Sequence, residues 1–337
     1  MTRSPAEDDP WAGWLDPDAW ARWLSGGYDA GWGPWLADAS GWRPQPVLPP
    51  IADPDAFVAE RQAQDEADGV WPTARERLVR HTDGKAGWGI AFLHGFGASR
   101  GEGEAVLDPL AAELGANLYY SLLPGHGRTP EDHATAPAEA YLRVAAESLA
   151  MAQAIGERVV LVGSSTGGLL ATWLAATWPD AVDALVLASP FYAFADPSTL
   201  ILRLPFGLDA VEWAYGAERD ASFHDPRVRD GYDQRWLTDQ RTRAVGHLER
   251  LRGWLARDDA YAAVRAPVCL LYHPDDKVVS VEAMHYALAH MQPHPHSRFV
   301  PIADGNHVLL SRYVRTDKEA ITRALRRFFA DLDGDAP

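Results

Sequence analysis

The stretch from residue 157 to residue 171 constrains the fold of this chain most. It opens with a short β-branched run, continues through Gly163-Ser164-Ser165-Thr166-Gly167, and ends in an Ala/Leu/Trp stretch with helical spacing. This pattern predicts a strand, a tight turn and a helix. Gly163 and Gly167 flank Ser165 at minus two and plus two, where a sharp turn leaves no room for a Cβ. Ser165 would then project as a nucleophile, unless the stretch is only a Gly/Ser loop that caps a helix.

Apolar runs on either side of this segment continue the alternation of strand and helix. Strands are predicted at residues 77–80, 87–93, 116–122, 184–188, 268–272 and 297–301, and helices at 104–114, 137–155, 166–178, 281–291 and 317–332. Strands that alternate with helices in this way predict a mostly parallel central sheet with helices on both faces. A ligand site in such a sheet lies at the carboxyl ends of the strands.

Two segments fall outside the alternation, so we expect a core made of residues 75–190 and 266–337. Residues 1–74 form a predicted N-terminal arm and linker helix, and seven of the fourteen tryptophans lie between Trp11 and Trp42. The indoles need a surface to bury against, either the core or a second copy of the chain, so a homo-oligomer through the arm is one expectation. Residues 191–265 are predicted to be partly helical and to cap the site.

Charge and composition limit the classes of partner. A net charge of -16 argues against nucleic acid and anionic membrane surfaces, which are themselves negative. No run of about 18 apolar residues predicts a membrane span, and the acidic first ten residues do not fit a signal peptide. The single cysteine, Cys269, cannot form an internal disulfide. We therefore expect a cytoplasmic protein without stable membrane insertion.

Two more polar residues follow predicted strands. Asp276 comes after the strand at 268–272, and His307 comes after the strand at 297–301. Serine at its ordinary pKa is a poor nucleophile and needs a histidine base, which in turn needs a carboxylate to orient it. The chain order Ser165, Asp276, His307 therefore predicts a catalytic triad. Asp275, next to Asp276, leaves open which carboxylate is used.

Together these motifs resemble the α/β-hydrolase superfamily, in particular its carboxylesterase, monoacylglycerol lipase and serine aminopeptidase-like group. The resemblance covers residues 75–332 and implies an α/β-hydrolase fold. It also implies that the backbone N–H groups of Phe96 and Thr166 form an oxyanion hole. The motifs that carry it are His94-Gly95-Phe96-Gly97-Ala98-Ser99, Leu123-Pro124-Gly125-His126-Gly127, the Ser165 turn, Asp276-Lys277-Val278-Val279 and Gly305-Asn306-His307.

The predicted function is serine-dependent hydrolysis of carboxylic esters with small to medium acyl chains, through an acyl-enzyme. Alternatives are a lipase or monoacylglycerol lipase acting on longer chains, a hydrolase of amides, peptides, thioesters or carbon–carbon bonds, and a ligand-binding protein on the same fold. The charges of the 191–265 segment suggest that it has no broad apolar face for docking on lipid. Its apolar residues are expected to line an acyl pocket: Phe191, Tyr192, Phe194, Leu200, Ile201, Leu202, Leu204 and Phe206.

No cofactor or metal is expected. The sequence contains neither a G-x-G-x-x-G nor a G-K-[ST] phosphate-binding motif. Four histidines gather near the C-terminus but lack a carboxylate or cysteine at ligand spacing, so we expect a solvated surface there: His285, His290, His294 and His296. His94 and His126 are expected to brace their loops through hydrogen bonds.

Overall fold

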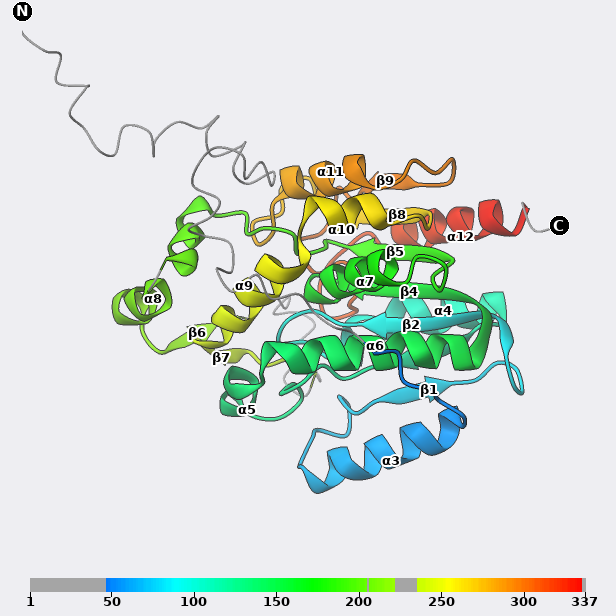
Figure 1. Cartoon of the computed structure of the whole chain (residues 1–337), viewed down its shortest axis with the longest axis horizontal. Helices are drawn as coiled ribbons and strands as arrows, with labels where there is room; N and C mark the ends of the chain where they lie inside the picture. The colour runs from blue at the N-terminus through cyan, green and yellow to red at the C-terminus, as the bar shows by residue number, and fades with distance from the viewer. Residues whose placement is uncertain (1–46, 205, 222–234, 335–337) are drawn as a thin grey trace, which may run out of the picture.

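The fold is built on a seven-stranded sheet with the strand order β1-β3-β2-β4-β5-β8-β9. A computed structural model describes residues 47–204, 206–221 and 235–334 of the chain (Figure 1). All neighbouring strands are parallel except β1, which pairs antiparallel with β3. The strands are β1 Arg77–Val79, β2 Ala86–Leu93, β3 Asn117–Tyr120, β4 Gly156–Ser164, β5 Ala184–Ala188, β8 Val268–Tyr272 and β9 Arg298–Pro301.

Helices cover both faces of the sheet. On β4, Val159 and Leu161 belong to one hydrophobic cluster, while Val160 and Val162 belong to the other. Successive side chains of a strand point to opposite faces, so each buried strand supplies both clusters. The first cluster lies under α6 Ala138–Ile155, α7 Thr166–Thr177 and α11 Val281–His290, and the second under α4 Glu104–Leu114 and α12 Lys318–Gly334.

This arrangement confirms the predicted fold class. The helix predicted at 104–114 and the strands predicted at 184–188 and 268–272 have those bounds in the structure, and the other predicted core helices and strands are present with ends displaced by a few residues. Cys269 on β8 is fully buried, as a small apolar residue in a central strand would be.

The chain between β5 and β8 leaves the sheet and forms the insertion, residues 191–265. Its elements before residue 242 lie together at one end of the sheet with the short helix α5 Pro130–Thr135 (Figure 1), whereas its last helix packs on α7 and α11. The insertion also contains a two-stranded hairpin of β6 and β7, which the sequence pattern does not indicate. Its elements are η4 Pro197–Arg203, α8 Gly207–Tyr215, β6 Glu218–Asp220, β7 Asp239–Arg241, α9 Ala244–Leu255 and α10 Asp258–Ala263.

The insertion is attached to the loop that follows β2. The Leu237 N–H donates to the Gly97 carbonyl at 2.7 Å, and the Ser99 hydroxyl donates to the Arg235 carbonyl at 2.9 Å. That loop turns through η3 Arg100–Glu102 into α4. The insertion is therefore held against the carboxyl end of the central strands.

Residues 1–46, which contain all seven tryptophans of the predicted arm, lie outside the described residues. The predicted linker helix is α3 Pro54–Ala67, and it packs on α6 and β1. Val58 is buried there, Arg61 forms an ion pair with Glu147, and the Gln62 amide donates to the Glu76 carbonyl at 2.8 Å. Among the helices described, none is both long and apolar enough to cross a bilayer.

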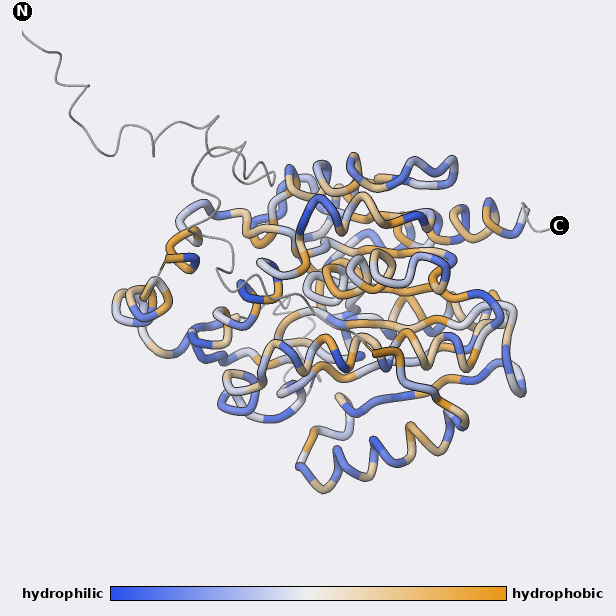
Figure 2. The backbone as a smooth tube through the Cα atoms, viewed as in Figure 1, coloured by the Kyte–Doolittle hydropathy of each residue, from blue (hydrophilic) through white to orange (hydrophobic). Residues whose placement is uncertain are grey.

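Several large hydrophobic side chains of the insertion are exposed, although its charges led us to expect no broad apolar face there. Apart from Val47, the exposed large hydrophobic side chains of the described residues all lie on η4, α8 or the junction between them. Figure 2 shows hydrophobic stretches in this part of the tube. The sequence argument used the charges of the insertion's later part, whereas these exposed side chains come from its first half: Ile201, Leu204, Phe206, Trp213 and Tyr215.

Candidate active site

Ser165 sits in a strained turn between β4 and α7. Its φ of 49° is in the left-handed region, which costs a non-glycine residue free energy and is characteristic of functional turns. A Cβ on Gly163 would lie 2.4 Å from the Gly167 carbonyl oxygen, and a Cβ on Gly167 would lie 1.9 Å from that of Leu93. Both glycines are therefore required by close backbone approach. The turn sits at the carboxyl end of β4, as the sequence predicts.

The structure brings Ser165, His307 and Asp276 into one chain of hydrogen bonds. His307 Nε2 lies 3.0 Å from the Ser165 hydroxyl oxygen, and His307 Nδ1 lies 2.9 Å from Asp276 Oδ2. All three residues are buried, each less than a tenth exposed. With Nδ1 donating to the carboxylate, Nε2 faces the serine hydroxyl as a proton acceptor.

Of the two adjacent carboxylates, Asp275 and Asp276, it is Asp276 that contacts His307. Burial acts to raise the pKa of this carboxyl, but the charge and hydrogen bond of His307 outweigh it, so the pKa lies below its ordinary value. The N–H groups of Val278 and Val279 also donate to Asp276 Oδ1, at 2.8 and 3.1 Å. Asp275 is exposed and pairs with Lys277. Only Asp276 faces the imidazole.

Two backbone N–H groups are free beside the serine. Among the described residues, neither Phe96 N–H nor Thr166 N–H donates to another group. Thr166 is the first residue of α7, where helical geometry leaves N–H groups without an internal acceptor. Phe96 lines the same cavity as Ser165. These are the two positions that the resemblance assigns to an oxyanion hole.

His94 and His126 hold the loop that carries Phe96. His94 Nε2 accepts from the Leu123 N–H at 3.0 Å, and His126 Nε2 accepts from the Gly97 N–H at 2.9 Å. Burial lowers the pKa of His126 to about 4 and that of His94 well below its ordinary value. Both imidazoles are therefore neutral, and both act as the braces that the sequence suggests.

Glu102 belongs to the same loop, although no motif singles it out. Its carboxylate accepts from the Gly95 N–H at 2.6 Å and from the Ser164 hydroxyl at 2.7 Å. Burial raises the pKa of this carboxyl. Glu102 thus ties the loop before Phe96 to the turn before Ser165. Only the contacts reveal this role, because no sequence pattern marks Glu102.

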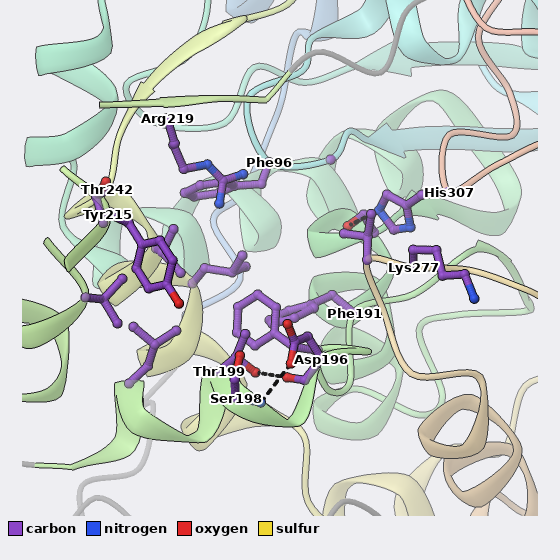
Figure 3. A pocket seen from close by; sticks show the side chains of 18 of the residues that line it. Phe96, Phe191, Asp196, Ser198, Thr199, Tyr215, Arg219, Thr242, Lys277 and His307 are labelled. Atoms are coloured by element: carbon purple, nitrogen blue, oxygen red, sulfur yellow. Dashed lines mark hydrogen bonds between the residues drawn. The ribbon is translucent and has the colours of Figure 1, made fainter. Parts of the chain in front are cut away.

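A cavity of about 690 Å³ opens beside Ser165 and His307 (Figure 3). Much of its lining is apolar, and it includes Phe191, Phe194, Ile201 and Leu202, as predicted. The other four predicted residues do not line it: Tyr192, Leu200, Leu204 and Phe206. Tyr192 is instead buried, with its hydroxyl 2.7 Å from that of Thr172, whereas Phe206 is 82% exposed.

Two of the four histidines expected at a solvated surface, His285 and His290, pack on aromatic rings. His285 lies 4.1 Å from Phe299 between ring centroids, and His290 stacks on Tyr286 at 3.9 Å. No group of three or more side chains in the described ranges, 47–204, 206–221 and 235–334, could hold a metal ion.

Comparisons with curated proteins find partial relatives. The chain is 30% identical over 114 residues to pimeloyl-[acyl-carrier protein] methyl ester esterases of Yersinia pseudotuberculosis and Yersinia pestis. The match covers 34% of this chain, and the chain spans 41% of the length of these relatives.

Solved structures share the fold over most of the chain. A structure of the metagenome-derived lipolytic enzymes LipS and LipT matches with a TM-score of 0.59 and 21% identity, covering 77% of this chain and 99% of that one. A monoacylglycerol lipase of Paleococcus ferrophilus matches with a TM-score of 0.54 and 17% identity, covering 76% and 98%.

The family match extends over the fold and over all three residues of the hydrogen-bonded chain. Residues 84–311 match the family described as serine aminopeptidase, S33. This range contains Ser165, Asp276 and His307, and it runs from just before β2 to beyond the last triad position. The chain belongs to the serine aminopeptidase, S33, family of the α/β-hydrolase superfamily.

Proposed function

We propose that this protein is a serine hydrolase that cleaves carboxylic esters through an acyl-enzyme. The observation that carries the proposal is the hydrogen-bonded chain of Ser165, His307 and Asp276, at 3.0 and 2.9 Å, beside a cavity with a largely apolar lining. The core would be residues 75–190 and 266–337, with 191–265 as its cap.

In the first half of the reaction, His307 Nε2 removes the proton of the Ser165 hydroxyl as its oxygen attacks the ester carbonyl. Asp276 holds the imidazole and stabilises its protonated form. Negative charge develops on the carbonyl oxygen, where the N–H groups of Phe96 and Thr166 can donate to it. The protonated His307 then gives its proton to the departing alcohol.

In the second half, a water molecule replaces the alcohol. His307 takes a proton from this water as it attacks the acyl group on Ser165, and returns the proton to the serine when the acid leaves. The loop that carries Phe96 is already fixed by His94, His126 and Glu102. Such preorganised donors cost no rearrangement during the reaction.

Esters are the preferred substrate class because the curated relatives are named as methyl ester esterases, and the cavity offers apolar surface to an acyl chain. Residues from η4 and α8 of the insertion enclose part of this cavity, which favours small to medium chains. Amide, thioester and carbon–carbon bond hydrolysis could use the same triad and are the alternatives within this class.

The direct test is the Ser165→Ala variant. It should lose ester hydrolysis by about a factor of 10⁶, as nucleophile removal does in other serine hydrolases, with an unchanged melting temperature. A fluorophosphonate should label the wild type on Ser165. Labelling at another residue, or activity retained in the variant, would reject the assignment.

A lipase acting on longer chains is the second candidate, because the exposed apolar side chains on η4 and α8 could meet a lipid surface. Rates on p-nitrophenyl esters from acetate to palmitate separate the two candidates. An optimum at about four to eight carbons supports the esterase. An optimum at palmitate, with activity on triolein that rises once droplets form, supports the lipase.

A further inference from the structure

Arg219 enters the cavity from the β6–β7 hairpin (Figure 3). In the hairpin register it lies opposite Gln240, and residues directly opposite on paired strands point to the same face. Gln240 is buried against Gly97, in the loop that carries Phe96. Glu218 and Asp220, one residue to either side of Arg219, are exposed. The hairpin therefore directs this one charge inward.

Among the residues that the structure describes, none is an acidic partner of the Arg219 guanidinium. Its Nε is shielded from solvent, and within the described part of the chain it makes no hydrogen bond or ion pair. Burial alone lowers its pKa, with no carboxylate contributing. A desolvated cation without a partner is unfavourable, and arginine keeps its charge at any ordinary pH.

The groups beside Arg219 do not neutralise it. His133 is fully buried near Arg219. Burial first, and then neighbouring positive groups that include Arg219, hold the pKa of His133 well below its ordinary value. Its ring packs 4.2 Å from that of Phe96. A neutral imidazole supplies no negative charge.

Other charged residues of the cavity lining already have partners. Glu218 pairs with Arg241, Lys277 pairs with Asp275, and both oxygens of Glu102 accept hydrogen bonds. Asp196 is at the exposed start of η4, where it accepts from the Ser198 N–H at 2.8 Å. Arg219 thus differs from them in being inward, largely desolvated and unpaired.

We propose that the substrate is an ester that carries a second, anionic group, a carboxylate or a phosphate, which binds Arg219 while the ester carbonyl lies at Ser165. This inference rests on the proposed function and specifies its substrate class. A guanidinium binds such groups through two parallel N–H donors, and the apolar lining between Arg219 and Ser165 would hold the linking chain.

Two substrate series test the proposal and locate the anion. Mono-p-nitrophenyl esters of dicarboxylic acids with four to eight carbons place it in the acyl part, and p-nitrophenyl esters of the matching neutral acids are their controls. The butyrate ester of glycerol 3-phosphate places it in the alcohol part, with glyceryl butyrate as control. We expect the wild type to favour the anionic ester of one series by about 10- to 100-fold in kcat/KM, the range of a charge-assisted hydrogen bond.

Variants assign the preference to Arg219. Arg219→Gln should lose it while changing kcat/KM on the neutral esters less than about threefold, and Arg219→Lys should keep part of it. Arg265→Gln makes the same change in net charge at the exposed last residue of the insertion, where Arg265 pairs with Asp180, and should keep the preference. No preference in the wild type, or an equal loss on neutral and anionic esters in Arg219→Gln, would overturn the proposal.

Binding separates this proposal from the proposed function. In the Ser165→Ala background, calorimetry should show tighter binding of the preferred anionic ester than of its neutral match, and Arg219→Gln should abolish that difference. Anion-dependent binding without hydrolysis of any ester by the wild type would reject the esterase and retain the anion site. Hydrolysis of neutral esters without anion-dependent binding would do the reverse.

Discussion

Asp276 and Asp275 provide a matched pair at the scale of single residues. Asp276→Asn should lower kcat on a p-nitrophenyl ester by about 10⁴, because an amide in place of the carboxylate favours the wrong imidazole tautomer. Asp275→Asn should leave kcat within about threefold, since Asp275 is exposed and pairs only with Lys277. The reverse ranking in steady-state kinetics would contradict the triad.

Glu102 allows a test of the loop that carries Phe96. The Gly95 N–H and the Ser164 hydroxyl donate to different oxygens of the Glu102 carboxylate, and in Glu102→Gln an NH2 donor replaces one of these two acceptors. We expect kcat to fall by about 10- to 100-fold with KM little changed. This is less than the effect of removing one oxyanion donor, because the Phe96 N–H would be displaced and not lost.

Affinity for a tetrahedral boronate inhibitor separates positioning from a general structural defect. It should weaken in parallel with kcat in Glu102→Gln while the melting temperature stays within a few degrees of the wild type. Full kcat in this variant would show that the loop holds its position without the carboxylate.

At the scale of single residues, the sequence predicted the site residues that follow strands. Ser165, Asp276 and His307 are each marked by position and order, because parallel strands bring their carboxyl ends to one edge. Glu102 and Arg219 have no such mark. The role of Glu102 depends on its contact with Ser164, and that of Arg219 on the cavity that it lines. The residues that form these environments are distant from Glu102 and Arg219 in the sequence.

At the scale of elements, the sequence predicted those with a clear apolar period. The helix at 104–114 and the strand at 184–188 have the expected bounds, because their apolar faces are buried in the core. The hairpin was missed because Glu218-Arg219-Asp220 and Asp239-Gln240-Arg241 contain no apolar residue from which to read a period of two.

Glu249 links η4 to α9 within the insertion. Its carboxylate accepts from Arg203 Nε at 2.9 Å and from Arg252 Nε at 2.8 Å, and all three side chains are buried. Burial would raise the pKa of Glu249, but the two arginines hold it below the ordinary value. Glu249→Gln therefore leaves two buried guanidinium groups without their shared charge.

The expected cost of Glu249→Gln is about 3 kcal/mol, the usual effect of removing one partner from a buried ion pair. Hydrogen exchange should show faster opening of 197–203 and 244–255, while exchange in the β4 strand stays slow. The exposed pair of Arg243 and Asp209 supplies the control, since Asp209→Asn should cost less than about 1 kcal/mol. Equal effects of the two variants would contradict a buried network.

At the scale of the whole molecule, one edge of the sheet carries the proposed chemistry and the insertion supplies the proposed selectivity. The Leu237 N–H, which donates to the loop after β2, and the Arg235 carbonyl, which accepts from it, connect the two parts. The tryptophan arm and assembly through it remain predictions from the sequence, as does the absence of a nucleic-acid partner.

Glu76 gives the fold a pH dependence that can be measured apart from activity. This carboxyl is 5% exposed, and burial raises its pKa to about 7 despite a 2.7 Å hydrogen bond from Tyr119 and the nearby charge of Arg61. The folded state thus holds a proton that the unfolded state releases near its ordinary pKa of 4.5. The native state binds more protons between these values, so the free energy of unfolding falls as pH rises from 4.5 to 7.

The contribution of Glu76 to this loss is about 3 kcal/mol, from a pKa difference of about 2.5 at about 1.4 kcal/mol per pH unit. Glu76→Gln keeps an acceptor for the Tyr119 hydroxyl and removes the ionisation. In urea unfolding, the variant should match the wild type near pH 4.5 and become more stable than it by up to about 3 kcal/mol at pH 8. Glu60→Gln on the exposed side of α3 should follow the wild type at both values. A Glu76→Gln variant whose stability stays parallel to that of the wild type across this range would show that Glu76 is ionised in the folded protein, and that Arg61 outweighs its burial.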